Sequence, residues 1–267
     1  MNLLEAVFLG ALQGLAEFLP VSSSGHLALA ATFMNLGEVP FLFDILLHVA
    51  TLAAVCIFFR KKIVSLILVL ARFLSRRPRE GDEDGMRMIG ALLAGTAVTA
   101  LIGFAIKDVA KNLPPVAISV LLVFTGVLLL VSSRFKMSGR TGSPGVLQGL
   151  IVGAAQGLGV LPGISRSGST IAASLLSGVD RRIAGEFSFL LSIPAILGAF
   201  ILELKDADTL GNTVPAYVLA AGMLAAFVVG YLSLRFLISL INRGKLGWFA
   251  AYLIPAGITL AIWFGVH

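Results

Sequence analysis

Two stretches of the sequence gather side chains that could carry out acid–base or nucleophilic chemistry. The first begins at Gln13 and ends at His26, with a carboxylate at Glu17 and three consecutive serines before the histidine. Gln13 and Glu17 lie four residues apart, so a helix would place both on one face. A proline then ends that helix, and Ser23 or Ser24 can cap the next one, whose free N–H groups attract an anion.

The second stretch, from Pro162 to Thr170, places one arginine among hydroxyl groups. A guanidinium group matches phosphate oxygens with paired donors, and hydroxyl and backbone N–H groups can fill the remaining lone pairs. The stretch is therefore suited to bind phosphate, although a carboxylate ligand would also fit. The arginine is Arg166, and the hydroxyl groups belong to Ser165, Ser167, Ser169 and Thr170.

Each stretch also has a purely structural interpretation. Arg166 could pair with Glu17 as a bridge between two parts of the chain. Glu17 could cap the serine turn, and His26 could bond a backbone carbonyl group. The functional and structural interpretations are compatible if the ion pair orders the site in the absence of a ligand.

Other ionisable residues carry weaker signals. Asp44 and His48 would share one helix face at the outer end of an apolar segment, where we expect interfacial hydrogen bonding. Glu186 is expected to pair at the surface with Arg181 or Arg182. The three histidines are not spaced as a metal-binding cluster.

The composition determines which elements can position these residues. Of the 267 residues, 58% are hydrophobic and only 13% are charged, and the mean hydropathy is +0.98. A soluble domain could not cover so much apolar surface with so few polar residues. The single Cys56 excludes an internal disulfide. We therefore expect an integral membrane protein, whose net charge of +6 reflects basic cytoplasmic loops rather than binding to nucleic acid.

Six apolar segments are long enough to cross a bilayer. Four shorter pieces form two pairs, each split by a Pro/Ser/Gly cluster, and each pair is expected to form a re-entrant helical hairpin. Broken backbone is tolerated at this depth only where it is buried or lines a polar cavity. A basic-flanked segment, 63–74, is expected at the membrane interface. The six spans are 42–59, 88–106, 116–133, 187–203, 214–232 and 247–265, and the short pieces are 3–19, 25–36, 146–161 and 169–178.

The fold class is thus all-α, with six transmembrane helices and two re-entrant hairpins. The start of the chain has no positively charged region, so no cleavable signal is expected. Lysine and arginine cluster after the first and third spans and before the fourth and sixth, which places both termini outside. The chain is expected to form one membrane domain, 1–267.

An internal repeat relates the two hairpins. The sequence GALQGL at Gly10 matches GAAQGL at Gly153, and the Ser-Gly pairs at Ser24 and Ser167 have the same offset. Repeat one covers 1–140, with a cytoplasmic insertion at 60–87, and repeat two covers 141–267. Each repeat has three spans, so the second is inverted relative to the first. Such repeats place a site near the midplane, where the two hairpins meet.

The two motifs together resemble the undecaprenyl-diphosphate phosphatase family, also called the bacitracin-resistance protein family. The motifs are Gln13-x-x-x-Glu17 leading into Pro20-Val-Ser-Ser-Ser-Gly-His26, and Pro162-Gly-Ile-Ser-Arg-Ser-Gly-Ser-Thr170, and the similarity spans essentially the whole chain.

The resemblance implies a hydrolase that converts undecaprenyl diphosphate to undecaprenyl phosphate and phosphate. This reaction recycles the lipid carrier of peptidoglycan synthesis, and so serves cell wall biogenesis and cell shape, and gives antibiotic resistance against bacitracin. The resemblance also implies the plasma (inner) membrane, an active site facing outside, and a divalent cation, Mg²⁺ or Ca²⁺. Functional positions carried over are Glu17, Ser23, His26, Ser165, Arg166, Ser167 and Thr170.

These residues suggest a set of roles. Arg166 would clamp the phosphates, and hydroxyl groups of Ser22, Ser165, Ser167 and Thr170 would donate to them. Glu17, with Gln13, would hold the cation, although many family members have glutamate at the position of Gln13. His26 would act as general base or acid. The nucleophile stays open between Ser23, His26 and a cation-bound water.

The substrate partner would be a polyprenyl diphosphate lipid, whose chain leaves between helices into the bilayer. Inverted repeats are also typical of transporters, so a lipid-phosphate flippase or anion transporter using the same site is the alternative function. The serine and histidine favour the enzyme, because transport needs neither a nucleophile nor a base. The sequence leaves open the prenyl chain length, flipping of the product, and the oligomeric state, for which a homodimer is one candidate.

Overall fold

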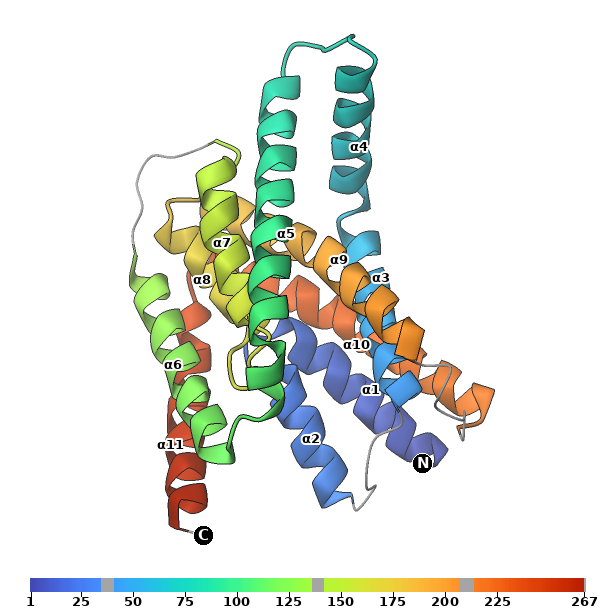
Figure 1. Ribbon diagram of the computed structural model, residues 1–267, viewed down its shortest axis with the longest axis vertical. Coiled ribbons are helices and arrows are strands. Elements are labelled where there is room, and N and C mark those ends of the chain that lie inside the picture. Colours follow the sequence, from blue (N-terminus) through green and yellow to red (C-terminus); the bar gives the residue numbers. More distant parts are fainter. Residues whose placement is uncertain (35–40, 136–141, 207–213, 267) are drawn as a thin grey trace.

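The computed structural model of the protein describes residues 1–34, 41–135, 142–206 and 214–266, and the regular secondary structure in these ranges is helical (Figure 1). Lys136, Arg140 and His267 lie outside the described residues. In chain order the helices are α1 (Leu3–Phe18), α2 (Ser23–Phe33), α3 (Phe41–Phe58), α4 (Arg60–Leu74), α5 (Asp82–Lys111), α6 (Pro115–Arg134), α7 (Val146–Leu158), α8 (Arg166–Leu176), α9 (Arg181–Asp206), α10 (Ala216–Asn242), the short 3₁₀ helix η2 (Leu246–Phe249) and α11 (Ala250–Val266).

The long apolar helices confirm an all-α membrane protein. Within the described residues, five helical stretches are long and apolar enough to cross a bilayer, formed by α5, α6, α9, α10 and η2 with α11. The remaining predicted span, 42–59, corresponds to α3, which passes the same test only together with α4, and the two helices meet at a bend of 74°. Several helices are longer than the predicted apolar spans, and α5 alone has 30 residues. These helices continue into polar sequence because backbone hydrogen bonding does not stop at the bilayer boundary.

The four short pieces form two helix pairs, α1 with α2 and α7 with α8. Their connecting turns meet, because the backbone N–H of Gly163 donates to Ser22 Oγ at 3.3 Å. Both turns need left-handed backbone: φ is 93° at Gly163 and 71° at Ser22. This conformation is ordinary for glycine but uncommon for serine. That the pairs re-enter the membrane from opposite sides stays a prediction.

The first helix of each pair packs against a helix from the other half of the chain. Helix α1 lies along α10, and α7 lies along α5, while α6 lies along α11 (Figure 1). Glycines permit the close approach, since a Cβ at Gly10 would collide with the carbonyl oxygen of Gly222, and one at Gly153 with that of Gly95. Small residues at such contacts are typical of membrane helix packing.

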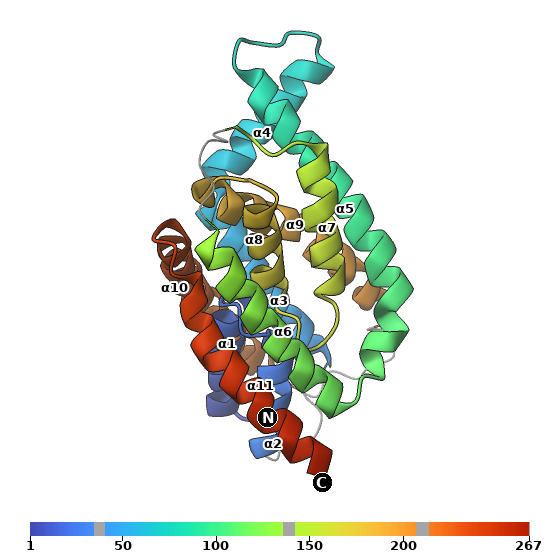
Figure 2. The same ribbon diagram turned by 90° about the vertical axis from the view of Figure 1, so that its left-hand side faces the viewer.

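The α4–α5 hairpin projects from one end of the molecule, and both termini lie toward the opposite end (Figures 1 and 2). Helix α4 packs on α5 through Val69, which contacts Gly85. The side chain of Arg72 donates to Asp82 near the turn, with one contact of 2.9 Å. That segment 63–74, which lies in α4, is located at the membrane interface stays a prediction.

One predicted surface pair has a different partner. Glu186 forms an ion pair with Lys62, with 2.8 Å between the charged atoms, instead of with Arg181 or Arg182. The bend between α3 and α4 brings Lys62 beside α9, and the sequence spacing gives no sign of that approach.

Candidate active site

An ion pair joins the two motifs across 149 positions of sequence. Arg166 donates from its guanidinium group to Glu17 Oε1. Glu17 lies at the end of α1, and Arg166 is the first residue of α8. Ser165 caps that helix by accepting the backbone N–H of Gly168 at 3.2 Å. The prediction that Glu17 and Arg166 share one site is confirmed, and so is the structural interpretation of them as a bridge.

The second carboxylate oxygen of Glu17 accepts two further hydrogen bonds. Ser23 Oγ donates to Glu17 Oε2 at 3.1 Å, and Gln13 Nε2 donates to the same oxygen at 3.2 Å. The carboxylate, at the very end of α1, is almost completely buried, with its side chain 3% exposed. A buried carboxylate with three donors is held in a fixed orientation. The hydroxyl of Ser23 is thereby tied to a group that can accept its proton.

His48 belongs to the site, although the sequence suggested only an interfacial role. Its Nδ1 lies 3.0 Å from Gln13 Nε2 and 3.6 Å from Glu17 Oε2. Because the amide nitrogen of Gln13 donates, Nδ1 of a neutral His48 accepts and the ring proton lies on Nε2. The signal that could have found His48 is its place well inside an apolar span, where an ionisable residue is costly. Asp44, one turn earlier, does not line the cavity described next.

Glu17, Ser23, His48 and Arg166 form the polar floor of a cavity of about 670 Å³. The first residues of α2 and α8, Ser23 and Arg166, both face it, so two helix N-termini direct partial positive charge into the same space. Such termini bind phosphate groups readily. The polar residues of the lining are Glu17, Ser22, Ser23, Ser24, His48, Gln156, Ser165 and Arg166, with Thr96, Thr99 and Lys107 of α5. The residues that α9 contributes are apolar.

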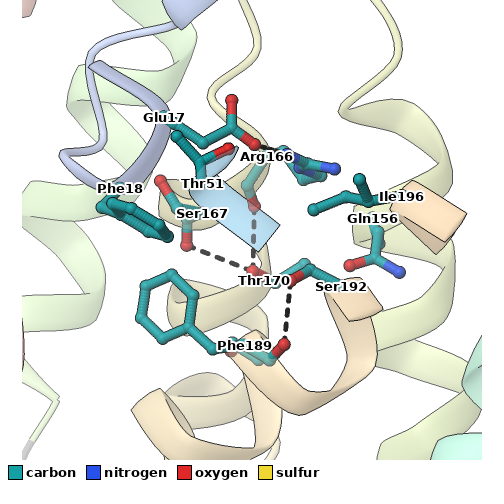
Figure 3. A pocket seen from close by; sticks show the side chains of 11 residues that line it. Glu17, Phe18, Thr51, Gln156, Arg166, Ser167, Thr170, Phe189, Ser192 and Ile196 are labelled. Atoms are coloured by element: carbon teal, nitrogen blue, oxygen red, sulfur yellow. Dashed lines mark hydrogen bonds and ion pairs between the residues drawn. The ribbon is translucent and has the colours of Figure 1, made fainter. Parts of the chain in front are cut away.

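Ser167 and Thr170 line a much smaller inner pocket, shown in Figure 3 with Glu17 and Arg166 pointing toward one another above it. Its volume of about 10 Å³ leaves room for roughly one water molecule. The hydroxyl of Thr170 donates to the carbonyl oxygen of Arg166 at 2.9 Å, and Ser167 Oγ lies 3.3 Å from Ser165 Oγ. Both side chains therefore brace the first turn of α8 beneath the arginine.

His26 points away from this cavity. Its Nδ1 donates to the carbonyl oxygen of Ser22 at 2.9 Å, and its Nε2 lies 2.7 Å from the hydroxyl of Tyr252 on α11. The ring lines two apolar clefts beside α11 instead. The structure thus brings Ser22, Ser23 and Ser165 to the cavity with Glu17 and Arg166, and places His26 behind the serine turn.

Comparison with known proteins shows the family of the chain. The family model described as bacitracin resistance protein BacA matches residues 6–259. The chain belongs to the BacA family. A protein of Treponema denticola named undecaprenyl-diphosphatase is 55% identical, over 99% of this chain and 98% of the relative. Proteins of the same name from Desulfatibacillum aliphaticivorans and Carboxydothermus hydrogenoformans are 42% identical, over 98% and 99%, and 40% identical, over 98% and 97%.

The site of this BacA-family chain has donors that suit a hard divalent cation. The Oε1 atom of Gln13 is buried and has no hydrogen-bond partner, and it belongs to the side chain that also contacts Glu17. Carboxylate and amide oxygens are the ligands that such cations prefer. Among the described residues, no three His, Cys, Asp or Glu side chains are grouped to hold a metal. A cation would therefore take its other ligands from water or phosphate.

Proposed function

We propose that this membrane protein hydrolyses undecaprenyl diphosphate to undecaprenyl phosphate and inorganic phosphate. The observation that carries the proposal is the hydrogen bond from Ser23 to the carboxylate that Arg166 also contacts. A nucleophile, a proton acceptor and a phosphate clamp thus meet at one cavity. Membership of the BacA family and the names of the similar proteins support the same reaction.

The geometry favours attack by the serine. Ser23 Oγ would bond to the terminal phosphorus as the bond from phosphorus to the bridging oxygen breaks, and Glu17 would take the hydroxyl proton. Polyprenyl phosphate leaves, and water then hydrolyses the phosphoserine to release phosphate and free Ser23. Splitting one difficult transfer into two steps is the usual benefit of a covalent intermediate.

Arg166 and the two helix N-termini would stabilise the charge that spreads over the phosphoryl oxygens in the transition state. The same guanidinium group holds Glu17 when no substrate is bound, so phosphate and carboxylate compete for it. We also propose that a divalent cation, Mg²⁺ or Ca²⁺, binds at Glu17 and Gln13 Oε1. Such a cation supplies further neutralisation of the phosphate charge.

The location of the reaction is part of the proposal. The basic α4–α5 hairpin would lie in the cytoplasm, and both termini and the mouth of the cavity would face the outside of the plasma membrane. Glu17, Ser23 and Arg166 all come from one chain, so a homodimer is not needed to complete the site.

Phosphate release from undecaprenyl diphosphate in detergent micelles tests the function. We expect Ser23→Ala to lower kcat about 10³-fold or more, and Arg166→Lys to lower kcat/KM by about 10³-fold, because lysine cannot supply paired planar donors. The matched controls are Ser65→Ala and Arg235→Lys, at exposed positions of α4 and α10, which should behave as wild type.

A rapid quench with terminally labelled substrate should trap phosphoserine in the wild-type protein. A folded Ser23→Ala protein with wild-type turnover would reject the serine nucleophile. If wild-type protein released no phosphate in micelles but moved lipid phosphate or anions across sealed vesicles, the transporter alternative would replace the phosphatase.

A further inference from the structure

The cavity extends beyond its polar floor into a groove between α5 and α9, which we call the α5–α9 groove. The lining positions recur every three or four residues on each helix, so each helix contributes one continuous face. From Thr96 to Lys107 the face of α5 is roughly 16 Å long at the usual helical rise. The groove is lined by Thr96, Thr99, Ala100, Gly103, Phe104 and Lys107 of α5 and by Pro194, Ala195, Gly198, Ala199 and Leu202 of α9.

The wall of this groove suits a hydrocarbon chain. Its two threonine hydroxyls are already used, because Thr96 donates to the carbonyl oxygen of Leu92 at 2.7 Å and Thr99 to that of Gly95 at 2.8 Å. Between the polar floor and Lys107 the remaining lining side chains carry no polar groups. A ligand that needs hydrogen bonds, such as a sugar or nucleotide, would lose them here.

Two glycines in the groove have no packing role. A Cβ at Gly198 would meet no atom within 4 Å, and one at Gly103 would meet only a methyl group of Val160 at 3.6 Å. By contrast, a Cβ at Gly10 or Gly153 would strike the backbone of a neighbouring helix. A glycine inside a helix costs about 1 kcal/mol relative to alanine. Glycine at Gly103 and Gly198 therefore keeps space open in the groove rather than allowing helices to touch.

The groove also connects the polar floor of the cavity to exposed apolar side chains. Phe104 and Leu202 at its rim are 56% and 45% exposed, and lipid chains surround such side chains in a membrane protein. Two other apolar clefts, of about 430 Å³ and 350 Å³, lie beside α11. Neither is lined by Glu17, Ser23 or Arg166.

We propose that the α5–α9 groove binds the isoprenyl units next to the diphosphate, and that Gly103 and Gly198 provide the room for them. The proposal rests on the phosphatase function and adds to it the path of the chain. With the terminal phosphate at Arg166, the chain runs between the two helices and leaves the protein beside Phe104 and Leu202. The polar floor thus binds the diphosphate end of one amphipathic substrate, and the apolar wall binds the start of its hydrocarbon chain.

A comparison of substrates with different chain lengths tests this path. In detergent, kcat/KM is measured with dimethylallyl diphosphate and with farnesyl diphosphate for the wild-type, Gly198→Leu and Gly103→Leu proteins. Leucine favours the helix and fills the groove, so the ratio of the farnesyl value to the dimethylallyl value should fall about tenfold or more in both variants. Two variants on facing helices guard against one that fails to fold.

Gly265→Leu is the matched control, because a Cβ at this α11 glycine also meets no atom within 4 Å and lies outside the groove; it should keep the wild-type ratio. Thermal unfolding in the same detergent confirms that each variant is folded. An unchanged ratio, or an equal loss for both substrates, would show that the groove is a water-filled entrance and overturn the proposal. A wild-type protein inactive on every prenyl diphosphate would instead remove the phosphatase function on which it rests.

Discussion

At the scale of single residues, Glu17 is the centre of the site. It accepts hydrogen bonds from Arg166, Ser23 and Gln13, and these donors come from α8, α2 and α1. A carboxylate with three donors is held in one orientation. It can nevertheless become a proton acceptor once phosphate draws the guanidinium group of Arg166 away, so substrate binding itself would free the carboxylate for its part in the reaction.

The structure turns the ring of His26 away from the cavity, so we expect it to position the serine turn rather than to act as the general base that the sequence suggests. Its Nδ1–H holds the carbonyl oxygen of Ser22, whose backbone is left-handed. We expect His26→Asn to keep more activity than His26→Ala, because the asparagine amide nitrogen can reproduce the Nδ1–H donor. The measurement is kcat and its pH profile in detergent.

Positioning of the serine turn by His26 predicts that the pH profile of His26→Asn keeps its wild-type shape. If kcat fell equally, by about 10²–10⁴-fold, in both variants and one limb of the pH profile disappeared, His26 would be the general base after all. Tyr252→Phe is a useful companion, since it removes only the hydroxyl that meets His26 Nε2.

The spacing of residues along the sequence predicted the part of this site that is local in the chain. It did not predict the contacts between distant helices. The residues from Gln13 to Ser23 and from Ser165 to Arg166 are local in sequence, and helix geometry fixes which of them share a face. His48 comes from a different helix, so its contact with Gln13 depends on how α3 packs against α1. The direction of the His26 ring depends in the same way on Tyr252, which is 226 positions away.

At the scale of elements, close helix contacts set the position of the residues that line the site. A Cβ at Gly14 would lie 2.5 Å from the carbonyl oxygen of Ala226 and 2.7 Å from the backbone nitrogen of Gly230. Gly14 follows Gln13 and precedes Glu17 by less than one turn. The separation of α1 from α10 therefore determines where the carboxylate lies relative to Arg166.

Gly14→Leu should push α1 away from α10 and destabilise the protein by about 1–3 kcal/mol, the usual cost of overpacking. Leucine is the better helix former, so the loss can come only from packing. Thermal unfolding in detergent and phosphate release measure the two effects. Gly265→Leu, in open space on α11, should change neither, and a Gly14→Leu protein as stable and active as that control would contradict the packing argument.

The spans were predictable because a bilayer demands long apolar segments, and each predicted span contains or overlaps a helix. Their ends were not, since helices such as α5 and α10 continue into charged sequence. The sequence also did not predict that α1 packs against α10 and α7 against α5. A glycine-rich face shows that a helix packs closely and leaves its partner unspecified.

At the scale of the whole molecule, the two termini lie toward one end and the basic α4–α5 hairpin lies at the other (Figure 1). The 30 residues of α5 extend roughly 45 Å at the usual rise, enough to cross the hydrocarbon core and both interfaces. We therefore expect the turns at the two ends of this one helix to lie on opposite sides of the membrane.

Cysteine labelling in a Cys56→Ala background checks the orientation. A thiol reagent that cannot cross membranes should label Asn112→Cys, at the α5–α6 turn, in intact cells. It should label Glu80→Cys, at the α4–α5 turn, only after permeabilisation, because the basic end is expected in the cytoplasm. The Cys56→Ala protein alone should remain unlabelled. The opposite pattern would place the cavity mouth in the cytoplasm.

The packing of α1 on α10 joins two helices that are synthesised at very different times. Helix α1 leaves the ribosome about two hundred residues before α10, a delay of roughly 10–40 s at ordinary rates of translation. For 149 residues of that synthesis the nascent chain carries Glu17 without its partner Arg166, and for the whole delay the glycine face of α1 lacks its partner α10. A chain truncated before α10 would therefore contain both motifs and still lack the helix that sets the position of α1 and Glu17.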